Sequence, residues 1–231
     1  MMNIRALLFD FGGTLDGAGV HWRDRTYRFL QQAYPEIDRD TFDRVDRAAV
    51  DKLIDSGNGP QLSLRETMDV IATGIYETLG LDRDIKDQYV DFFCEDAKEH
   101  LDRNRQWLAT LRDRYRIGVI SNNFGNTQGW CDEYELLPLL DIVIDSTVVG
   151  VLKPEADIFH AALTGINASP NEAIYVGDTY LDDVVGAKGV GMWTAWLVGM
   201  EDKECPNASL VDVQLTELQE LKGFLESVNR T

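Results

Sequence analysis

Hydrophobic and polar positions along the chain alternate between two kinds of stretch. Stretches with helical spacing lie at 155–166 and 181–191. Short apolar runs, most of them ending in a polar or glycine-containing turn, lie at 5–11, 116–122, 140–146, 172–178 and 192–198, with a weaker one at 208–213. Buried parallel strands are continuous apolar runs, and helices connect them. The order therefore predicts an α/β fold with a Rossmann-like parallel sheet covered by helices on both faces.

The interval from about residue 17 to 102 has a different pattern. It is polar and rich in charge, has helical spacing in stretches such as "LRETMDVIATGIYETLG", and contains no convincing buried strand. Within it, "DSGNGPQLS" at 55–63 has the composition of a loop. We predict a core domain of residues 1–16 and 103–231, with a helical cap domain of residues 17–102 inserted between the first two strands.

Composition and charge narrow the class of protein. The chain has 231 residues, 44% of them hydrophobic, and a formal net charge of −18. Binding to a nucleic-acid backbone depends on clustered Lys and Arg, so a nucleic-acid partner is not expected. A small phosphorylated partner remains compatible, because one pocket can be positive in an acidic protein. The sequence carries no signal for the oligomeric state.

The cysteines and the apolar segments predict a cytoplasmic protein. Cys94, Cys131 and Cys205 lie far apart and form no CxxC pair, so free thiols in a reducing compartment are expected. The first apolar stretch is short and ends in an acid, unlike a signal peptide. No run of about 18 apolar residues is present, so no association through a membrane-spanning helix is expected.

Polar side chains follow several predicted strands where chemistry is usually located. Asp10 ends the first run, Ser121 the second and Asp178 the fourth, while Lys153 stands just before a proline and a helical stretch. Each has an ordinary reading by itself: a capping acid, a turn serine or a solvated lysine. Because ligands bind at the carboxyl ends of parallel strands, these side chains are candidates for one common site.

Further acids follow the fourth run in "GDTYLDD". Asp182 and Asp183 come soon after Asp178, and carboxylates this close repel one another unless a cation lies among them. Oxygen ligands of this kind suit Mg²⁺. A helix N-terminus also favours acids, which explains Asp182 and Asp183 but less naturally an acid at the end of a buried strand.

Taken together in this order, these motifs resemble those of the haloacid dehalogenase-like superfamily, and in particular its phosphatase branch. The resemblance spans nearly the whole chain and implies a helical cap of the first type for the inserted interval. The residues that carry it are Asp10 with Thr14, Ser121, Lys153 in "LKPEADIF", and Gly177 and Asp178 followed by Asp182 or Asp183.

The resemblance implies a metal-dependent covalent mechanism. Asp10 would attack phosphorus and form an aspartyl-phosphate that water later hydrolyses. The expected Mg²⁺ ligands are the carboxylate of Asp10, the main-chain carbonyl of Gly12 and the carboxylate of Asp178.

The remaining motif residues would act on the phosphoryl group. Ser121 and Lys153 are expected to be catalytic and to bind substrate, and Asn122 is expected to assist in that binding. Asp182 or Asp183 would support the site indirectly, by orienting Lys153 or a metal-bound water.

Position 12 departs from the family pattern. Family phosphatases usually carry an acid/base aspartate where this chain has Gly12. Turnover should therefore be slow, or restricted to good leaving groups such as acyl and aryl phosphates, because a positioned acid is worth about 10²–10⁴-fold in rate. Asp16 and His21 are the nearest alternative acids, although we expect Asp16 to be a helix-capping or hinge acid. We expect a water or a cap residue, not a carboxylate, in the vacated place. The cap is also expected to supply substrate contacts, for which His21, Trp22 and Arg25 are candidates.

Three other functions remain compatible with the pattern. Phosphonate-cleaving relatives use a buried cap lysine, for which Lys52, Lys86 and Lys98 are candidates, although we expect all three to be solvated. Dehalogenases of the family work without a metal and lack an acid site like "GDTYLDD". A binding or regulatory protein with weak turnover is the third alternative, favoured by Gly12.

Overall fold

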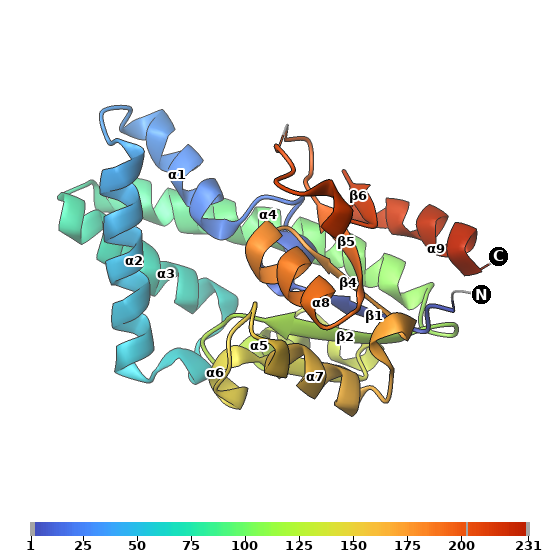
Figure 1. Cartoon of the computed structure of the whole chain (residues 1–231). Coiled ribbons are helices and arrows are strands. Elements are labelled where there is room, and N and C mark those ends of the chain that lie inside the picture. Colours follow the sequence, from blue (N-terminus) through green and yellow to red (C-terminus); the bar gives the residue numbers. More distant parts are fainter. Residues whose placement is uncertain (1–2, 202, 230–231) are drawn as a thin grey trace.

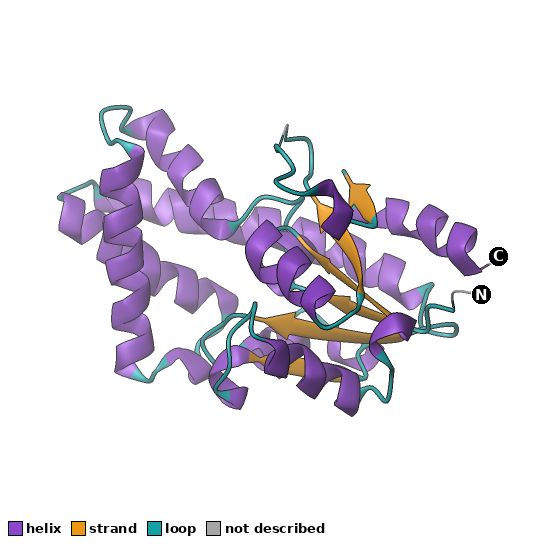
Figure 2. Ribbon diagram, in the orientation of Figure 1, coloured by secondary structure: helices purple, strands orange, loops and turns teal. Residues whose placement is uncertain are grey.

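The computed structural model describes residues 3–201 and 203–229 and contains one parallel sheet (Figures 1 and 2). The spatial order of its six strands is β3-β2-β1-β4-β5-β6, and every neighbouring pair is parallel. The strands are β1 (Ala6–Phe9), β2 (Arg116–Ser121), β3 (Ile142–Asp145), β4 (Ala173–Gly177), β5 (Trp193–Leu197) and β6 (Val213–Leu215). The predicted α/β fold is confirmed.

The weakest strand prediction was misplaced. Residues 208–210 form a 3₁₀ turn, and the last strand begins only at Val213. The side chain of Asn207 accepts the backbone N–H of Ser209 at 3.1 Å and so starts the turn. Asparagine favours such local bonds, which compete with a strand.

Both faces of the sheet are buried, which explains the continuous apolar runs. Along β1, Leu7 and Phe9 enter one core cluster, whereas Ala6 and Leu8 enter another on the opposite face. The first cluster is covered by α4 (Arg83–Ala109), α5 (Thr127–Glu133) and α9 (Leu221–Asn229). The second is covered chiefly by α7 (Ala156–Gly165) and α8 (Gly186–Gly189); the short α6 (Ser146–Val149) follows β3.

The inserted interval folds entirely into helices and turns. Helices α1 (Trp22–Ala33), α2 (Arg39–Ser56) and α3 (Leu64–Leu79) lie to one side of the sheet with the first part of α4 (Figure 1). They share a separate apolar cluster built on Leu30, Phe42 and Ile75. Helix α4 runs without a break through residues 102 and 103, where the cap was expected to end, and continues onto the sheet.

Local sequence sets the ends of these helices. Ser63 begins α3 with a capping box, in which its hydroxyl accepts the N–H of Glu66 and the Glu66 carboxylate accepts the N–H of Ser63. Gly57 ends α2 at a φ of 67°, a left-handed conformation that glycine adopts without strain. Within the described ranges no helix is both long and apolar enough to span a membrane.

Candidate active site

The turn after β1 brings two acids together at the carboxyl edge of the sheet. Asp10 follows β1 directly, and its N–H donates to Val176 O on β4 at 2.9 Å. Gly13 in this turn has a φ of 81°, and a Cβ there would lie 2.6 Å from Oδ2 of Asp178. Glycine at position 13 therefore permits both the left-handed turn and the close approach of Asp178.

Lys153 lies buried between two carboxylates. Its Nζ is 2.8 Å from Oδ1 of Asp10 and 2.7 Å from Oδ1 of Asp183, and it donates to Tyr175 Oη at 3.0 Å. Tyr175 in turn donates to Ile120 O at 2.9 Å. Burial alone would lower the pKa of Lys153, but the two carboxylates outweigh burial and hold it well above its usual value. Lys153 is thus a fixed positive charge.

The two acids that follow Asp178 have different environments. Asp183 is fully buried, and besides its contact with Lys153 it accepts the N–H of Thr179 at 2.8 Å through Oδ2. Both of its oxygens are therefore engaged. Asp182 is half-buried and lines the cavity described below. The sequence left these two acids as alternatives, and Asp183 is the one that contacts Lys153.

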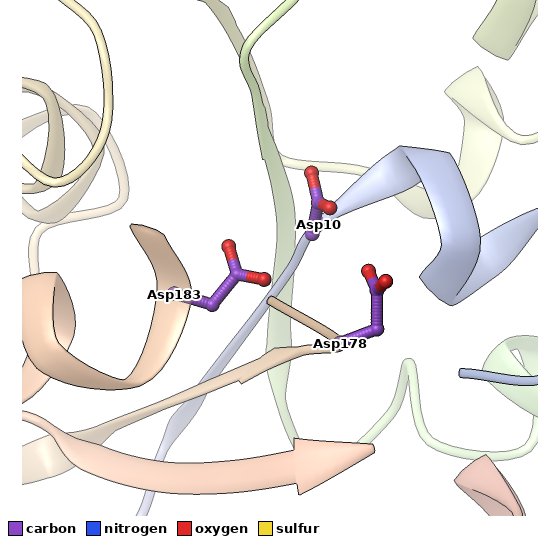
Figure 3. A group of neighbouring side chains, drawn as sticks. All are labelled: Asp10, Asp178 and Asp183. Atoms are coloured by element: carbon purple, nitrogen blue, oxygen red, sulfur yellow. The ribbon is translucent and has the colours of Figure 1, made fainter. Parts of the chain in front are cut away.

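Asp178 has a buried oxygen without a partner. Its Oδ1 accepts the hydroxyl of Thr14 at 3.1 Å, whereas no hydrogen bond to Oδ2 is found from any described residue. Carboxylate oxygens of Asp10, Asp178 and Asp183 lie within 4.8 Å of one another and gather around one space (Figure 3). An unpartnered buried carboxylate oxygen in an all-oxygen donor set fits a hard divalent cation such as Mg²⁺.

Asp10 and Asp178 hold their protons more tightly than free aspartate. Burial, opposed by Lys153 and reinforced by Asp183, raises the pKa of Asp10 to about 7. Burial first, then the charges of Asp10 and Asp183, hold the pKa of Asp178 well above its usual range. One buried lysine therefore does not neutralise the site, which remains short of positive charge.

Ser121 and Asn122 lie at the end of β2 and line the same cavity as Asp10. The amide of Asn122 is engaged on both sides: it donates to Lys153 O at 3.0 Å and accepts Lys153 N–H at 2.8 Å. Substrate binding by Asn122 stays a prediction. What the structure shows is that Asn122 holds the main chain that carries Lys153.

The space beyond Gly12 is filled by a side chain from α1. A Cβ built on Gly12 would lie 3.2 Å from Nε1 of Trp22. That indole N–H donates to Oδ2 of Asp16 at 2.5 Å, and Oδ1 of Asp16 accepts the N–H of Gly13 at 2.6 Å. Among the described residues, Trp22 supplies the atoms nearest to such a Cβ, and the carboxylate of Asp16 lies close by, between the indole and the turn.

Asp16 and Arg25 belong to the link between α1 and the turn after β1. Arg25 lies 3.4 Å from Oδ2 of Asp16 through one terminal nitrogen and donates to Asp96 at 2.7 Å through the other. Neither residue is among those that line the cavity. The contacts of Asp16 join these two segments, and its role as a helix-capping or hinge acid stays a prediction.

His21 does line the cavity. Its Nδ1 accepts the N–H of Arg23 at 3.2 Å, so the neutral ring carries its proton on Nε2. Loss of water around the ring and the charge of Arg23 lower the pKa of His21, although the residue as a whole is exposed. Both effects favour the neutral ring.

A cavity of about 490 Å³ opens above the acids. Its lining combines polar side chains, such as those of Asp10, Ser121 and Lys153, with a large apolar part. The apolar lining comprises Trp22, Val50, Ile54, Met68, Ile71, Phe124, Trp130 and Leu152. Sequence reasoning missed most of these residues, because the helical spacing of an apolar wall and of a helix core is the same.

None of the three cap lysines lines the cavity. Lys52 and Lys98 are exposed, as expected. The expectation of a solvated Lys86 is wrong: only 5% of Lys86 is exposed, and its Nζ pairs with Asp69 at 2.5 Å and with Asp87 at 2.7 Å. The half-exposed carboxylates of Asp69 and Asp87 neutralise the buried charge of Lys86, so this lysine has a structural role.

Comparisons with known proteins agree with this arrangement. Residues 4–191 match the family model of the haloacid dehalogenase-like hydrolases. A glyceraldehyde 3-phosphate phosphatase of Pyrococcus furiosus is 36% identical over 132 residues, which cover 53% of this chain and 52% of the relative. The chain thus matches about half the length of this relative.

Two solved structures share the fold over almost the whole chain. A HAD phosphatase from Thermococcus onnurineus has a TM-score of 0.55 and 24% identity, covering 96% of this chain and 98% of that one. A dehalogenase captured with an intermediate has a TM-score of 0.65 and 17% identity, covering 97% and 98%. On the strength of the family model, this chain belongs to the haloacid dehalogenase-like hydrolases.

Proposed function

We propose that the protein is a Mg²⁺-dependent phosphatase that acts on a small phosphorylated molecule through an aspartyl-phosphate. One observation carries this proposal: a buried aspartate at the end of β1 contacts a buried lysine and stands beside Asp178, whose Oδ2 has no partner. A carboxylate next to fixed positive charge and a metal-type acid cluster suits phosphoryl transfer. The relative from Pyrococcus furiosus, named a phosphatase, supports the same reaction class.

The chemistry takes two steps. A carboxylate oxygen of Asp10 bonds to phosphorus while the bond to the leaving-group oxygen breaks, and that oxygen departs with the electron pair. Water then bonds to phosphorus while the bond between phosphorus and the Asp10 oxygen breaks, and its proton passes to the solvent, so that inorganic phosphate and the Asp10 carboxylate are released. Lys153 would balance negative charge on the phosphoryl oxygens, and Ser121 would donate a hydrogen bond to one of them.

The metal site of the proposal uses the residues that the acid cluster provides. Asp10, Asp178 and the main-chain carbonyl of Gly12 would hold Mg²⁺, while Asp183 keeps Lys153 in position. When bound, Mg²⁺ supplies positive charge to the phosphoryl oxygens and offsets the excess of buried carboxylates.

The inserted helices are proposed to form a cap over this site, with residues 1–16 and 103–231 as the core. Helices α1, α2 and α3 supply cavity walls through Trp22, Ile54 and Ile71. Because α4 continues through the expected boundary, the cap shares one rigid helix with the core. A cap that covers the cavity would exclude water from the reacting atoms.

The alternatives differ in what the site offers them. A phosphonate-cleaving reaction requires a lysine in the cavity from the cap, and Lys52, Lys86 and Lys98 lie outside it. A binding protein with weak turnover is the second candidate, because Trp22 fills the space beside Gly12. The fold shared with dehalogenases does not decide the reaction, since identity with the dehalogenase structure is only 17%.

The test is metal-dependent release of phosphate from acetyl phosphate. Acetyl phosphate is small and has a good leaving group, so it reports on the central machinery alone. We expect release with Mg²⁺, none with a chelator, and none from Asp10→Asn, whereas Asp113→Asn, a change at an exposed acid, should match the unmodified protein. Undiminished activity in Asp10→Asn would refute the nucleophile, and no release from the unmodified protein would favour the binding candidate.

A further inference from the structure

The cavity wall nearest to the nucleophile is aromatic. Trp22 lies against Gly12, and its ring stacks on Trp130 with centroids 5.3 Å apart and an angle of 34°. Phe93 also packs against Trp22, with ring centroids 5.3 Å apart and an angle of 80°. Phe124 lines the cavity as well. A flat ring attached to the phosphoryl oxygen would contact these walls in the offset geometries that aromatic pairs favour.

A second part of the cavity wall is aliphatic. It is formed by Val50 and Ile54 of α2 and by Met68 and Ile71 of α3. The cavity volume of about 490 Å³ is within the range of sites for small organic molecules. A ring placed against these side chains would bury apolar area, which a hydroxyl-rich leaving group of the same size would not do.

The charges that line the cavity are negative on balance. Arg23 and Lys153 are the arginine and lysine side chains of the described lining, and Asp10, Asp46 and Asp182 are its acids. The Nε of Arg23 donates to Asp46 at 2.6 Å, and Asp46 is only 5% exposed. Lys153 faces Asp10 and Asp183. A second anionic group on the substrate would therefore meet more acids than cations in the lining.

Position 12, beside the nucleophile, offers the leaving oxygen no acid. Gly12 has no side chain, and the indole N–H of Trp22 is given to Asp16. His21 accepts the N–H of Arg23 at Nδ1, which favours its neutral form. A leaving oxygen that departs as an anion needs no acid at this position. The pKa of a phenol is about 10, as in tyrosine, whereas that of water, and similarly of an aliphatic alcohol, is about 15.7. A phenolate therefore departs far more readily than an alkoxide.

We infer that the substrate is an aryl phosphate monoester whose leaving group is an uncharged aromatic alcohol without a second anionic group. The inference rests on the proposed phosphatase function and specifies its substrate class. In the first step the aryl oxygen leaves with the electron pair of its bond to phosphorus and takes a proton from water after departure.

The first test compares two substrates of matched size, phenyl phosphate and cyclohexyl phosphate. Both present a six-membered ring, but only one gives a stable leaving anion and a flat face. We expect kcat/KM to favour phenyl phosphate by at least about 100-fold, the lower bound for a missing general acid. A preference below 100-fold overturns the inference.

The second test addresses the apolar wall. Ile54 lines the cavity yet is 55% exposed, so Ile54→Asn changes the wall with little effect on folding. The ratio of kcat/KM for 2-naphthyl phosphate to that for acetyl phosphate should fall about 3- to 10-fold, as expected for lost apolar contact. Val70→Asn is the matched control, because Val70 is 42% exposed on α3 and outside the cavity lining. An unchanged ratio in Ile54→Asn overturns the placement of the ring.

Acetyl phosphate separates the two levels of the argument. If Mg²⁺-dependent, Asp10-dependent hydrolysis of acetyl phosphate is absent, the proposed function itself fails. If that hydrolysis is present and phenyl phosphate is not preferred over cyclohexyl phosphate, only the assignment of the substrate class fails.

Discussion

Replacement of Asp178 by asparagine should make the metal-free protein more stable and abolish its response to Mg²⁺. In the metal-free site three buried carboxylates face one lysine, and Oδ2 of Asp178 has no partner. Asparagine keeps the shape of the side chain and an acceptor for the hydroxyl of Thr14, but it removes one buried negative charge. The two effects have opposite signs, which a general loss of packing could not produce.

The expected size follows from the pKa shifts. Burial raises the pKa of Asp10 from 3.8 to about 7, which corresponds to a difference on the order of 4 kcal/mol between its charged and neutral forms. The pKa of Asp178 is raised in the same direction. A carboxyl group whose pKa is higher in the folded than in the unfolded protein contributes its full stability below the unfolded-state pKa, and this contribution is lost as pH rises. Of the two pH values below, the charge of Asp178 should therefore lower the free energy of unfolding more at pH 8. We expect a gain of at least about 1 kcal/mol, or about 2–4 °C in Tm.

The assay is thermal unfolding followed by circular dichroism at pH 5.5 and pH 8, with a chelator or with excess Mg²⁺. At a concentration 100 times its Kd, Mg²⁺ adds about 2.7 kcal/mol to the unmodified protein, or roughly 5–10 °C. Asp178→Asn should gain less than about 2 °C, and its advantage without metal should shrink at pH 5.5. Asp113→Asn, at an exposed position, should behave as the unmodified protein. Equal stabilisation of Asp178→Asn by Mg²⁺ would refute Asp178 as a ligand.

Three further substitutions probe the groups around the nucleophile. Lys153→Met leaves buried carboxylates unpaired and should cost about 3–5 kcal/mol in urea unfolding; a cost below 1 kcal/mol would contradict the buried pairing. Trp22→Phe keeps an aromatic ring but leaves Oδ2 of Asp16 with only the 3.4 Å contact to Arg25, so about 1–3 kcal/mol should be lost in the same assay. Trp107→Phe should lose less, because the indole N–H of Trp107 has no partner among the described residues. Asn122→Ala frees the main chain of Lys153 and should lower kcat for acetyl phosphate more than it changes KM; a change in KM alone would show substrate binding instead.

The sheet and the position of its acids were predictable because burial on both faces leaves a plain sequence signal. In β1, Leu7 and Leu8 face opposite cores, so the run is apolar without alternation. Parallel strands then place the residue after each strand at one edge, which is why Asp10 and Asp178 meet although 167 intervening residues separate them. Local sequence does not show which strands pair. Once all strands are parallel, however, their common direction is enough to place these acids at the same edge of the sheet.

Other parts of the site had no local signal. Tyr175 has the pattern of a core aromatic, and only the fold shows that its hydroxyl accepts a bond from Lys153. The choice between Asp182 and Asp183 depends on which residue of one turn points inward, and two neighbouring acids are equivalent in the sequence. The end of the cap was placed inside α4 because the change from cap contacts to sheet contacts occurs within one uninterrupted helix.

Position 12 links the chemistry of the site to its packing. A Cβ on Gly12 would lie 3.2 Å from the indole of Trp22, so a larger side chain there requires the indole to move. That indole is held by Asp16, whose other oxygen holds the N–H of Gly13 in the turn after the nucleophile. An acid at position 12 and a tryptophan held in this place therefore compete for one space. In this chain tryptophan occupies it, which removes a proton donor and at the same time puts an aromatic wall beside the phosphoryl site. A preference for aromatic leaving groups that need no proton is then the expected result of both changes.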